Sequence, residues 1–269
     1  MHAFEYHRPA NSKDAVSLVK GKTEARFLAG GQSLVQAMKL RLSSPSDLID
    51  LGTIKDLAGI KVSGGTVEIG AMTRHADVAE SKDVQKAIPA LAALAGIIGD
   101  RQVRHMGTIG GSLANNDPAA DYPAAVLGLG ATITTNKRKI EADKYFTGLY
   151  ETALEAGELI TSVSFPVPKR AAYMKFKNPA SRFAIVGVFV ADFGAGSKNP
   201  VRVGVTGAGA CAFRQADLEK ALSAKFTVEA AAAIKVKPDG LNNDLHASPE
   251  YRAHLITVMA KRAVEAALK

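Results

Sequence analysis

The chain has 269 residues, of which 47% are hydrophobic, so it can bury the core of two modest domains or of one large one. Its single cysteine, Cys211, excludes an internal disulfide and any zinc site or iron–sulfur cluster built from several thiolates of this chain. The 34 basic and 26 acidic residues give a net charge of +8, but the positive charges are scattered, so nucleic-acid binding is disfavoured.

The apolar runs, such as the one at residues 87–98, are too short to span a membrane. The first ten residues lack the apolar core that is typical of a signal peptide. We therefore expect no membrane span and a cytoplasmic protein.

Short strand-like and helical runs alternate in the first half of the chain, which is typical of an α+β fold. Residues 26–30 have the pattern of a strand that leads into a helix, and residues 60–70 that of a hairpin. The almost entirely apolar segment 91–98 predicts a buried helix. The basic run at 136–139 lies between two apolar stretches, where a hairpin turn is expected.

Two prolines, Pro166 and Pro168, remove backbone donors and restrict the residues before them, so they predict the end of the first region. Apolar strand-like runs and then helical ones follow, and they predict a sheet with helices on one face. The expected units are a domain over 1–170, with subdomains at about 1–56 and 57–170, and a second domain over 171–269.

The sequence AGGQSL places Gly30 and Gly31 between a strand and a helix. Backbone N–H groups of such a turn can converge on an anion, and glycine allows a phosphate to approach the chain closely. An ordinary strand-to-helix turn explains this motif alone equally well. No P-loop lysine follows, so a nucleotide-hydrolysing site is disfavoured.

A second pair, Gly110 and Gly111, occurs in GTIGGS at 107–112. One phosphate needs one loop, whereas the pyrophosphate of a dinucleotide can use two. We therefore interpret the two glycine pairs as a clasp for a dinucleotide cofactor. This interpretation also accounts for the lack of an acid–base cluster in the sequence.

Two aspartates, Asp117 and Asp121, are four residues apart and could face the same way on a helix. Asp117 precedes a proline and is more simply read as a helix N-cap, which leaves Asp121 to accept a hydrogen bond from a ribose. The pattern G-x-G-x-x-A at 207–212 has Glu229 downstream, but no strand leads to Glu229, so a Rossmann nicotinamide site is disfavoured. The six histidines show no metal-site spacing.

The segments AGGQSLVQAMKLRL, DRQVRHMGTIGGSLANNDPAADYPA and YRAHLITVMAKRAVEAA resemble, together with the rest of the chain, the FAD-binding medium subunit of the molybdenum hydroxylases. That family includes the carbon monoxide dehydrogenase medium subunit and the xanthine dehydrogenase FAD subunit. The resemblance implies an α+β fold, with a two-subdomain FAD-binding region of the vanillyl-alcohol oxidase-like type. A smaller C-terminal α+β domain with an antiparallel sheet and helices would follow.

The resemblance also implies FAD-contacting residues, with no catalytic residue and no metal ligand in this chain. The pyrophosphate would lie against Leu28, Ala29, Gly30, Gly31, Gln32, Ser33 and Leu34. The second loop would comprise Thr108, Ile109, Gly110, Gly111, Ser112 and, just beyond it, Asn115. The remaining contacts would be Asp121 on the adenosine half, Ile98 and Ile160 against the flavin, and Tyr173 and Lys175 where the C-terminal domain reaches the isoalloxazine.

Three places depart from the family pattern. Gln36 stands where proline is usual, and Asn115 and Asn116 replace a common His-Ala or Cys-His pair, which puts the polar contacts of that loop in doubt. Arg182 stands where many relatives carry aspartate, and this change could alter the site that faces the electron acceptor.

The function implied by the resemblance is that of an electron-transfer flavoprotein subunit of a multi-subunit oxidoreductase. It would accept electrons from the clusters of a small iron–sulfur subunit and pass them through FAD to an external acceptor, while a large molybdenum-cofactor subunit oxidises the substrate. The assembly would be a dimer of heterotrimers. Two alternatives remain open: a self-contained FAD oxidoreductase that uses NAD(P)H, and a nucleotide- or nucleic-acid-binding module.

Overall fold

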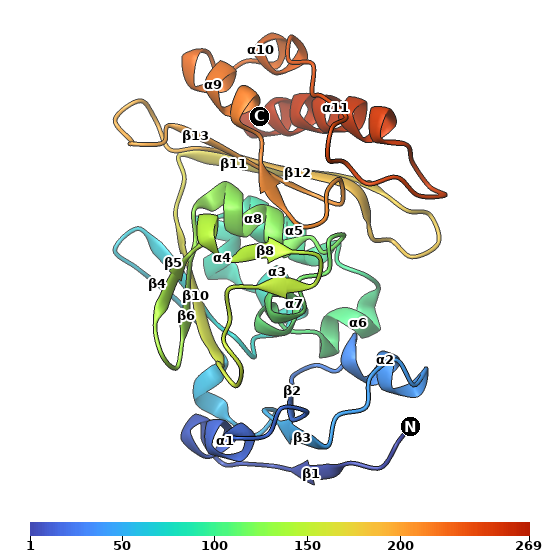
Figure 1. The fold of residues 1–269 in the computed structure, drawn as a ribbon. Helices are drawn as coiled ribbons and strands as arrows, with labels where there is room; N and C mark the ends of the chain where they lie inside the picture. Colours follow the sequence, from blue (N-terminus) through green and yellow to red (C-terminus); the bar gives the residue numbers. More distant parts are fainter.

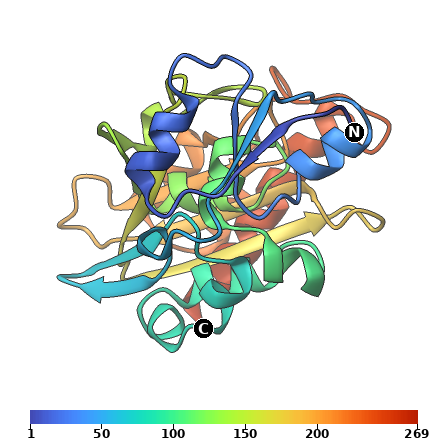
Figure 2. The same cartoon turned by 90° about the horizontal axis from the view of Figure 1, so that it is seen from below.

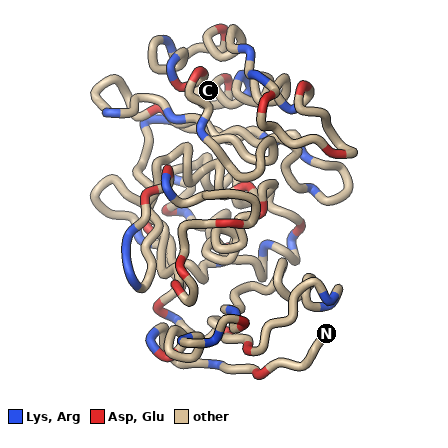
Figure 3. The backbone as a smooth tube through the Cα atoms, viewed as in Figure 1, with Lys and Arg blue, Asp and Glu red and all other residues tan.

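Three sheets of three or more strands follow one another along the molecule in the computed structural model, which describes residues 1–269 (Figure 1). The N-terminal sheet lies at one end, a five-stranded sheet with most of the helices lies in the middle, and the C-terminal sheet with its own helices lies at the other end. Seen from below, the N-terminal residues lie in front of the middle layer, and the C-terminal helix lies behind both (Figure 2). Basic and acidic residues are interspersed along all three layers (Figure 3).

The N-terminal layer is a small parallel sheet of order β1-β3-β2, with a core of eight buried residues. Asn11 starts the first helix by accepting a hydrogen bond from the N–H of Asp14 at 2.9 Å. The elements are β1 (Glu5–His7), α1 (Ser12–Val19), β2 (Arg26–Leu28), α2 (Leu34–Lys39), β3 (Asp47–Asp50) and the 3₁₀ turn η1 (Lys55–Leu57).

The middle layer holds an antiparallel sheet of order β4-β5-β10-β6-β7, and its cluster of 31 buried residues is the largest core of the molecule. Its strands are β4 (Ile60–Ser63), β5 (Thr66–Gly70), β6 (Thr132–Thr135), β7 (Lys139–Glu141) and β10 (Ile160–Pro166), with β8 (Phe146–Gly148) and β9 (Glu151–Thr152) as a separate pair. Its helices are α3 (His75–Glu80), α4 (Lys82–Ala87), α5 (Pro89–Gly96), α6 (Arg101–Met106), α7 (Ile109–Asn115), α8 (Tyr122–Leu129) and the 3₁₀ turn η2 (Ala142–Lys144).

Two local predictions are confirmed in this layer. Helix α5 carries the apolar segment expected to be buried, and both Leu91 and Leu94 are completely inaccessible to solvent. Strands β6 and β7 pair in antiparallel fashion, so the basic run between them forms the expected hairpin turn. Because every residue of α8 is buried as well, these helices hold the middle of the molecule together.

The C-terminal layer is an antiparallel sheet of order β11-β12-β13-β14, with helices on its outer face, as predicted (Figure 1). All nine residues of β12 are buried, because α11 covers one face of the sheet while α8 packs on the other. None of the helices combines the length and apolarity needed to cross a membrane. The elements are β11 (Arg170–Lys177), β12 (Ala184–Asp192), β13 (Val201–Thr206), β14 (Phe213–Arg214), α9 (Ala216–Ala224), α10 (Val228–Ala232) and α11 (Pro249–Leu268).

The expectation that Asp117 caps a helix is wrong, because α8 begins only after Asp121. The segment between them forms a turn in which Asp117 Oδ1 accepts a hydrogen bond from the N–H of Ala119 at 2.9 Å. Tertiary contacts explain the difference: the Pro118 carbonyl accepts from the N–H of Gly207, and the Ala120 carbonyl accepts from the Thr206 hydroxyl. These carbonyls are therefore not available to a helix.

Candidate functional site

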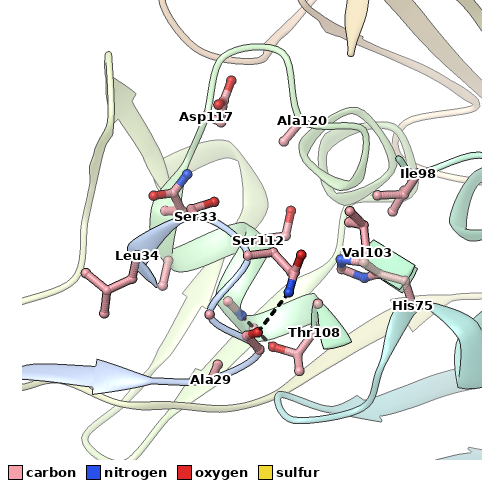
Figure 4. A pocket seen from close by; sticks show the side chains of 18 of the residues that line it. Ala29, Ser33, Leu34, His75, Ile98, Val103, Thr108, Ser112, Asp117 and Ala120 are labelled. Carbon is pink, nitrogen blue, oxygen red and sulfur yellow. Dashed lines mark hydrogen bonds between the residues drawn. The ribbon is translucent and has the colours of Figure 1, made fainter. Parts of the chain in front are cut away.

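A cavity of about 730 Å³ lies where the first glycine segment, α6, α7 and the loop after β11 meet (Figure 4). The cavity brings together most of the predicted cofactor-binding residues. They are Ala29, Gly30, Gly31, Gln32, Ser33, Leu34, Ile98, Thr108, Gly110, Gly111, Ser112, Asn115, Asp121 and Ile160. Four predicted residues do not line it, namely Leu28, Ile109, Tyr173 and Lys175.

The first glycine segment runs between the end of β2 and the start of α2, as expected. Gly31 has φ of +71°, a left-handed conformation that L side chains rarely adopt. A Cβ atom on Gly30 would lie only 2.0 Å from the carbonyl oxygen of Met106, at the end of α6. Both positions therefore require glycine, and Gly30 lets this segment lie directly against α6.

The backbone N–H groups of Gly30, Gly31, Gln32 and Ser33 donate to no acceptor within the protein. All four residues line the cavity. The side chain of Gln32 also turns back, since its Nε2 donates to the Gly30 carbonyl at 3.4 Å. Unpaired consecutive N–H groups beside a cavity are the donors that an anionic group such as a phosphate uses.

The second glycine pair differs from the first, and the interpretation of two equivalent loops needs correction. Gly110 and Gly111 lie in the first turn of α7, capped by Thr108, whose Oγ1 accepts from the N–H of Gly111 at 3.1 Å. The N–H groups of Ile109 and Gly110 donate to the carbonyls of Thr73 and Ala71. The donors at the start of α7 are thus used within the protein.

Close packing requires glycine at position 110, while a Cβ at position 111 would make its tightest contact with Thr108 Oγ1, at 3.0 Å. A Cβ atom on Gly110 would lie 2.6 Å from the Cβ of Ala71, and one on Gly111 would lie 3.4 Å from the Cβ of Ala29. Helix α7 consequently fits tightly against the first glycine segment and forms a wall of the cavity. Ile109 is absent from the lining because its side chain is fully buried in the core.

The asparagines that depart from the family pattern have different roles. Asn115, the last residue of α7, lines the cavity. Asn116 is buried and ends the helix in a left-handed conformation with φ of +43°, which asparagine tolerates better than most residues. Its Nδ2 donates to the carbonyls of Gly148 and Glu151, so Asn116 connects α7 to the β8–β9 pair.

His75 lies on a wall of the cavity near Ile98 and Val103 (Figure 4). Burial lowers the pKa of His75 to about 4, and the positive charge of Arg104 adds to the effect. The imidazole is therefore neutral at pH 7, and its buried Nδ1 has no hydrogen-bond partner. No local sequence pattern singles out this histidine, because the six histidines show no metal-site spacing.

Asp121 lines the cavity, but its carboxylate is held by the C-terminal sheet. Tyr173 donates its hydroxyl to Oδ1 at 2.6 Å, and Lys175 Nζ lies 2.9 Å from Oδ2. Burial raises the pKa of Asp121, while the charge of Lys175 and the two hydrogen bonds oppose the rise. In this arrangement Tyr173 and Lys175 reach the carboxylate of Asp121 instead of the cavity.

Several lining residues lay outside the sequence-based prediction. Some of them, such as Gly107 and Asp117, lie inside the motifs already quoted, and Arg182 had been singled out as a departure from the family pattern. Most of the others come from segments far apart in the chain, although Asp100 carries the recognisable signal of a helix N-cap. The additional residues are Arg26, Phe27, Leu51, Ala71, Met72, His75, Gly99, Asp100, Val103, Gly107, Ala114, Asp117, Ala120, Leu154, Glu158, Leu159, Ala180, Ser181, Arg182 and Phe183. No group of three or more His, Cys, Asp or Glu residues could hold a metal ion.

Unpaired N–H donors beside an adjoining wall with isoleucines suit an anionic, partly apolar ligand. Residues 2–168 match the family model of the FAD binding domain in molybdopterin dehydrogenase. Residues 171–267 match that of the CO dehydrogenase flavoprotein C-terminal domain. The chain belongs to this family of FAD-binding medium subunits of molybdenum hydroxylases, so the predicted family and the predicted class of flavoprotein subunit are confirmed.

Individual relatives agree with this assignment over nearly the whole chain. The carbon monoxide dehydrogenase medium chain of Afipia carboxidovorans is 37% identical, over 98% of this chain and 96% of its own length. The nicotine 6-hydroxylase medium subunit of Paenarthrobacter nicotinovorans is 35% identical, over 97% and 96%. The structure of carbon monoxide dehydrogenase from Hydrogenophaga pseudoflava matches with a TM-score of 0.87 and 34% identity, over 99% and 98% of the two chains, which confirms the predicted fold class.

Proposed function

We propose that the cavity holds FAD and that the chain serves as the electron-transfer subunit of a molybdenum hydroxylase. The observation that carries the proposal is the set of unpaired N–H groups from Gly30 to Ser33 beside a cavity of about 730 Å³. A pyrophosphate accepts several such hydrogen bonds, and a Cβ on Gly30 would displace the segment that supplies them. The residues present therefore fit the cofactor.

Each part of the cavity has a separate task in this proposal. The segment from Leu28 to Leu34 positions the pyrophosphate, with its donors on Gly30 to Ser33. The side chains of Ile98 and Ile160 supply apolar surface for the flavin ring, and α7 with Asn115 closes one side. FAD, when bound, supplies the redox chemistry, and the protein supplies binding, orientation and electrostatics.

Asp121 is proposed to meet the adenosine half of FAD with a carboxylate already oriented by Tyr173 and Lys175. These two residues would then influence the cofactor through Asp121 and not by direct contact. The proposed domains are a FAD-binding domain over 1–170, in two subdomains at about 1–56 and 57–170, and a C-terminal domain over 171–269. The C-terminal domain supports one wall of the site.

The partners follow from what this chain lacks. The relatives are named medium chains or medium subunits, and Cys211 is the only cysteine, so thiolate-held clusters have to come from another chain. We propose a small iron–sulfur subunit, a large molybdenum-cofactor subunit and a cytoplasmic dimer of such heterotrimers. The electrons would travel from the clusters through FAD to an external acceptor.

Purification from the native source at low salt tests this proposal. Three different chains should elute together with FAD, iron and molybdenum. A chain that elutes alone, carries FAD and reduces an acceptor from its own substrate would contradict it. Turnover of the isolated chain with NAD(P)H would favour the self-contained oxidoreductase instead, and a purified chain without yellow colour would favour a nucleotide- or nucleic-acid-binding module.

A further inference from the structure

A second, smaller cavity of about 180 Å³ lies between the turn that precedes α8, the loop after β11 and the segment that leads into α11. Two residues of the turn, Pro118 and Ala119, line this small cavity. Asp117, Ala120 and Asp121 of the same turn line the large cavity, so the turn is part of the partition between the two. Cavities of about 150 Å³ can hold a benzene molecule, so the small cavity has room for one small ring with a polar substituent.

The charges in the wall of the small cavity compensate each other. Arg252 is only 3% exposed, and its Nη2 donates to Oδ2 of Asp244 at 2.6 Å. Its Nη1 donates to the carbonyls of Ile185 and Gly207, at 2.7 and 2.9 Å, while its Nε is buried and has no acceptor. His246, the remaining titratable residue of the wall, is exposed. An ion would meet no unpaired buried charge of opposite sign here, so a neutral ligand is favoured.

Two asparagines of the wall each keep one side-chain atom without a partner in the protein. Asn178 is buried, and its Oδ1 accepts from the N–H groups of Ala180 and Ser181, at 2.9 and 3.2 Å, whereas its Nδ2 has no acceptor. Asn242 has the opposite arrangement, since its Nδ2 donates to the Gly209 carbonyl at 2.8 Å and its Oδ1 has no donor. The wall thus offers an amide donor from one asparagine and an amide acceptor from the other.

We propose that the small cavity binds a neutral carboxamide and that these two asparagines recognise it. The amide oxygen of the ligand accepts from Nδ2 of Asn178, and the amide N–H of the ligand donates to Oδ1 of Asn242. A carboxylate lacks this donor and brings an unpaired charge, and a ketone lacks the donor alone. The hydrocarbon part of the ligand lies against the apolar residues of the wall, which are Pro118, Ala119, Phe183, Ala184 and Ile185.

This inference does not depend on the proposed FAD site, because neither Asn178 nor Asn242 lines the large cavity. Both asparagines are held in place by contacts of their own. The backbone N–H of Asn178 donates to the Phe183 carbonyl at 2.8 Å, and that of Asn242 donates to the Ala208 carbonyl at 2.8 Å. The two recognition groups are therefore fixed before a ligand arrives, which lowers the entropic cost of binding.

The test is an NMR titration of the FAD-loaded protein with three compounds of similar shape, namely benzamide, benzoate and acetophenone. Benzamide should bind most tightly to the wild type, because benzoate carries a charge and acetophenone has no N–H to donate. Asn178→Asp keeps an oxygen for the N–H groups of Ala180 and Ser181 but replaces the free donor by an acceptor. At slightly alkaline pH it should weaken the binding of benzamide and of acetophenone about tenfold.

Two further variants separate the two asparagines and control for charge. Asn242→Ala removes the acceptor, so it should weaken benzamide binding about three- to tenfold and leave acetophenone binding unchanged. Asn243→Asp makes the same Asn-to-Asp change at an exposed position that does not line the cavity, and both affinities should stay at their wild-type values.

Two results would overturn the inference: benzamide that binds the wild type no better than benzoate does, or benzamide that binds folded Asn178→Asp as tightly as the wild type. The comparison of the three compounds on the wild type needs no substitution, so it decides the matter even where a variant fails to fold. A purified protein without flavin absorbance would contradict the proposed function instead, and the same titrations can be made on it.

Discussion

Asp121 and Lys175 form an ion pair that connects the cavity wall to the C-terminal sheet. The Nζ of Lys175 lies 2.9 Å from Oδ2 of Asp121, and each side chain is only 4% exposed. Tyr173, two residues before Lys175 on β11, binds the other carboxylate oxygen. Because Asp121 immediately precedes α8, this contact fixes the start of a helix whose residues are all buried.

Removing the positive charge of Lys175 should lower the free energy of unfolding. Lys175→Met leaves the Asp121 carboxylate buried without its counter-charge, so we expect a loss of about 3–5 kcal/mol in the free energy of unfolding. Urea denaturation at neutral pH measures the change. Lys177→Met, at the exposed end of the same strand, is the matched control and should change stability by less than about 0.5 kcal/mol.

A double variant separates the ion pair from simple packing. Asp121→Asn combined with Lys175→Met removes both charges, so it should be more stable than Lys175→Met alone. If the single and double variants unfold at the same urea concentration, the charge of Asp121 is not what Lys175 compensates.

The lowered pKa of His75 should make the protein less stable as the pH falls. Its pKa is lowered to about 4 by burial and by Arg104, from an ordinary value of 6.5. As the pH falls below 6.5, the unfolded chain binds a proton that the folded chain does not, so the free energy of unfolding decreases until about pH 4. The full effect is on the order of 3 kcal/mol.

His75→Phe checks this assignment, because phenylalanine has a similar ring and no proton to bind. Chemical denaturation at a series of pH values should show the wild type losing more stability than the variant on acidification. Curves that stay parallel between pH 7 and pH 4 would show that another group is responsible.

The sequence predicted best those features that depend on neighbouring residues. The glycine segment before α2, the buried helix α5 and the β6–β7 hairpin all follow from local pattern, and the structure contains each of them. The prediction that Asp117 caps a helix was wrong. Carbonyls of its turn accept hydrogen bonds from Thr206 and Gly207, which lie far along the chain.

At the site too, contacts between segments far apart in the chain could not be predicted from the sequence. The family resemblance brought Tyr173 and Lys175 to attention, but it could not show that both reach Asp121, more than fifty residues earlier in the chain. It also could not distinguish the free N–H groups of Gly30 and Gly31 from those of α7, whose acceptors lie on another segment. Such pairings depend on tertiary packing, which no local motif encodes.

Gly110→Ala should lower the stability of the fold. It should not remove a hydrogen-bond donor from the cofactor, because the N–H of Gly110 already donates within the protein. Its Cβ would lie 2.6 Å from the Cβ of Ala71 and 2.7 Å from the Ala71 carbonyl oxygen, so α7 has to shift. We expect a loss of about 1–3 kcal/mol in the free energy of unfolding. Gly196→Ala, where a new Cβ meets nothing within 4 Å, is the control, and equal melting of the two variants would contradict the packing role.

The most direct test of FAD binding by the first glycine segment is to identify and quantify the flavin released on denaturing the purified protein. The wild type and Gly196→Ala should each release FAD at close to one molecule per chain. Gly30→Ala should release little, since its Cβ would meet the Met106 carbonyl oxygen at 2.0 Å and displace the donors from Gly30 to Ser33. Circular dichroism should show all three proteins folded. Release of FMN from the wild type, or a full complement of FAD from folded Gly30→Ala, would contradict the assignment.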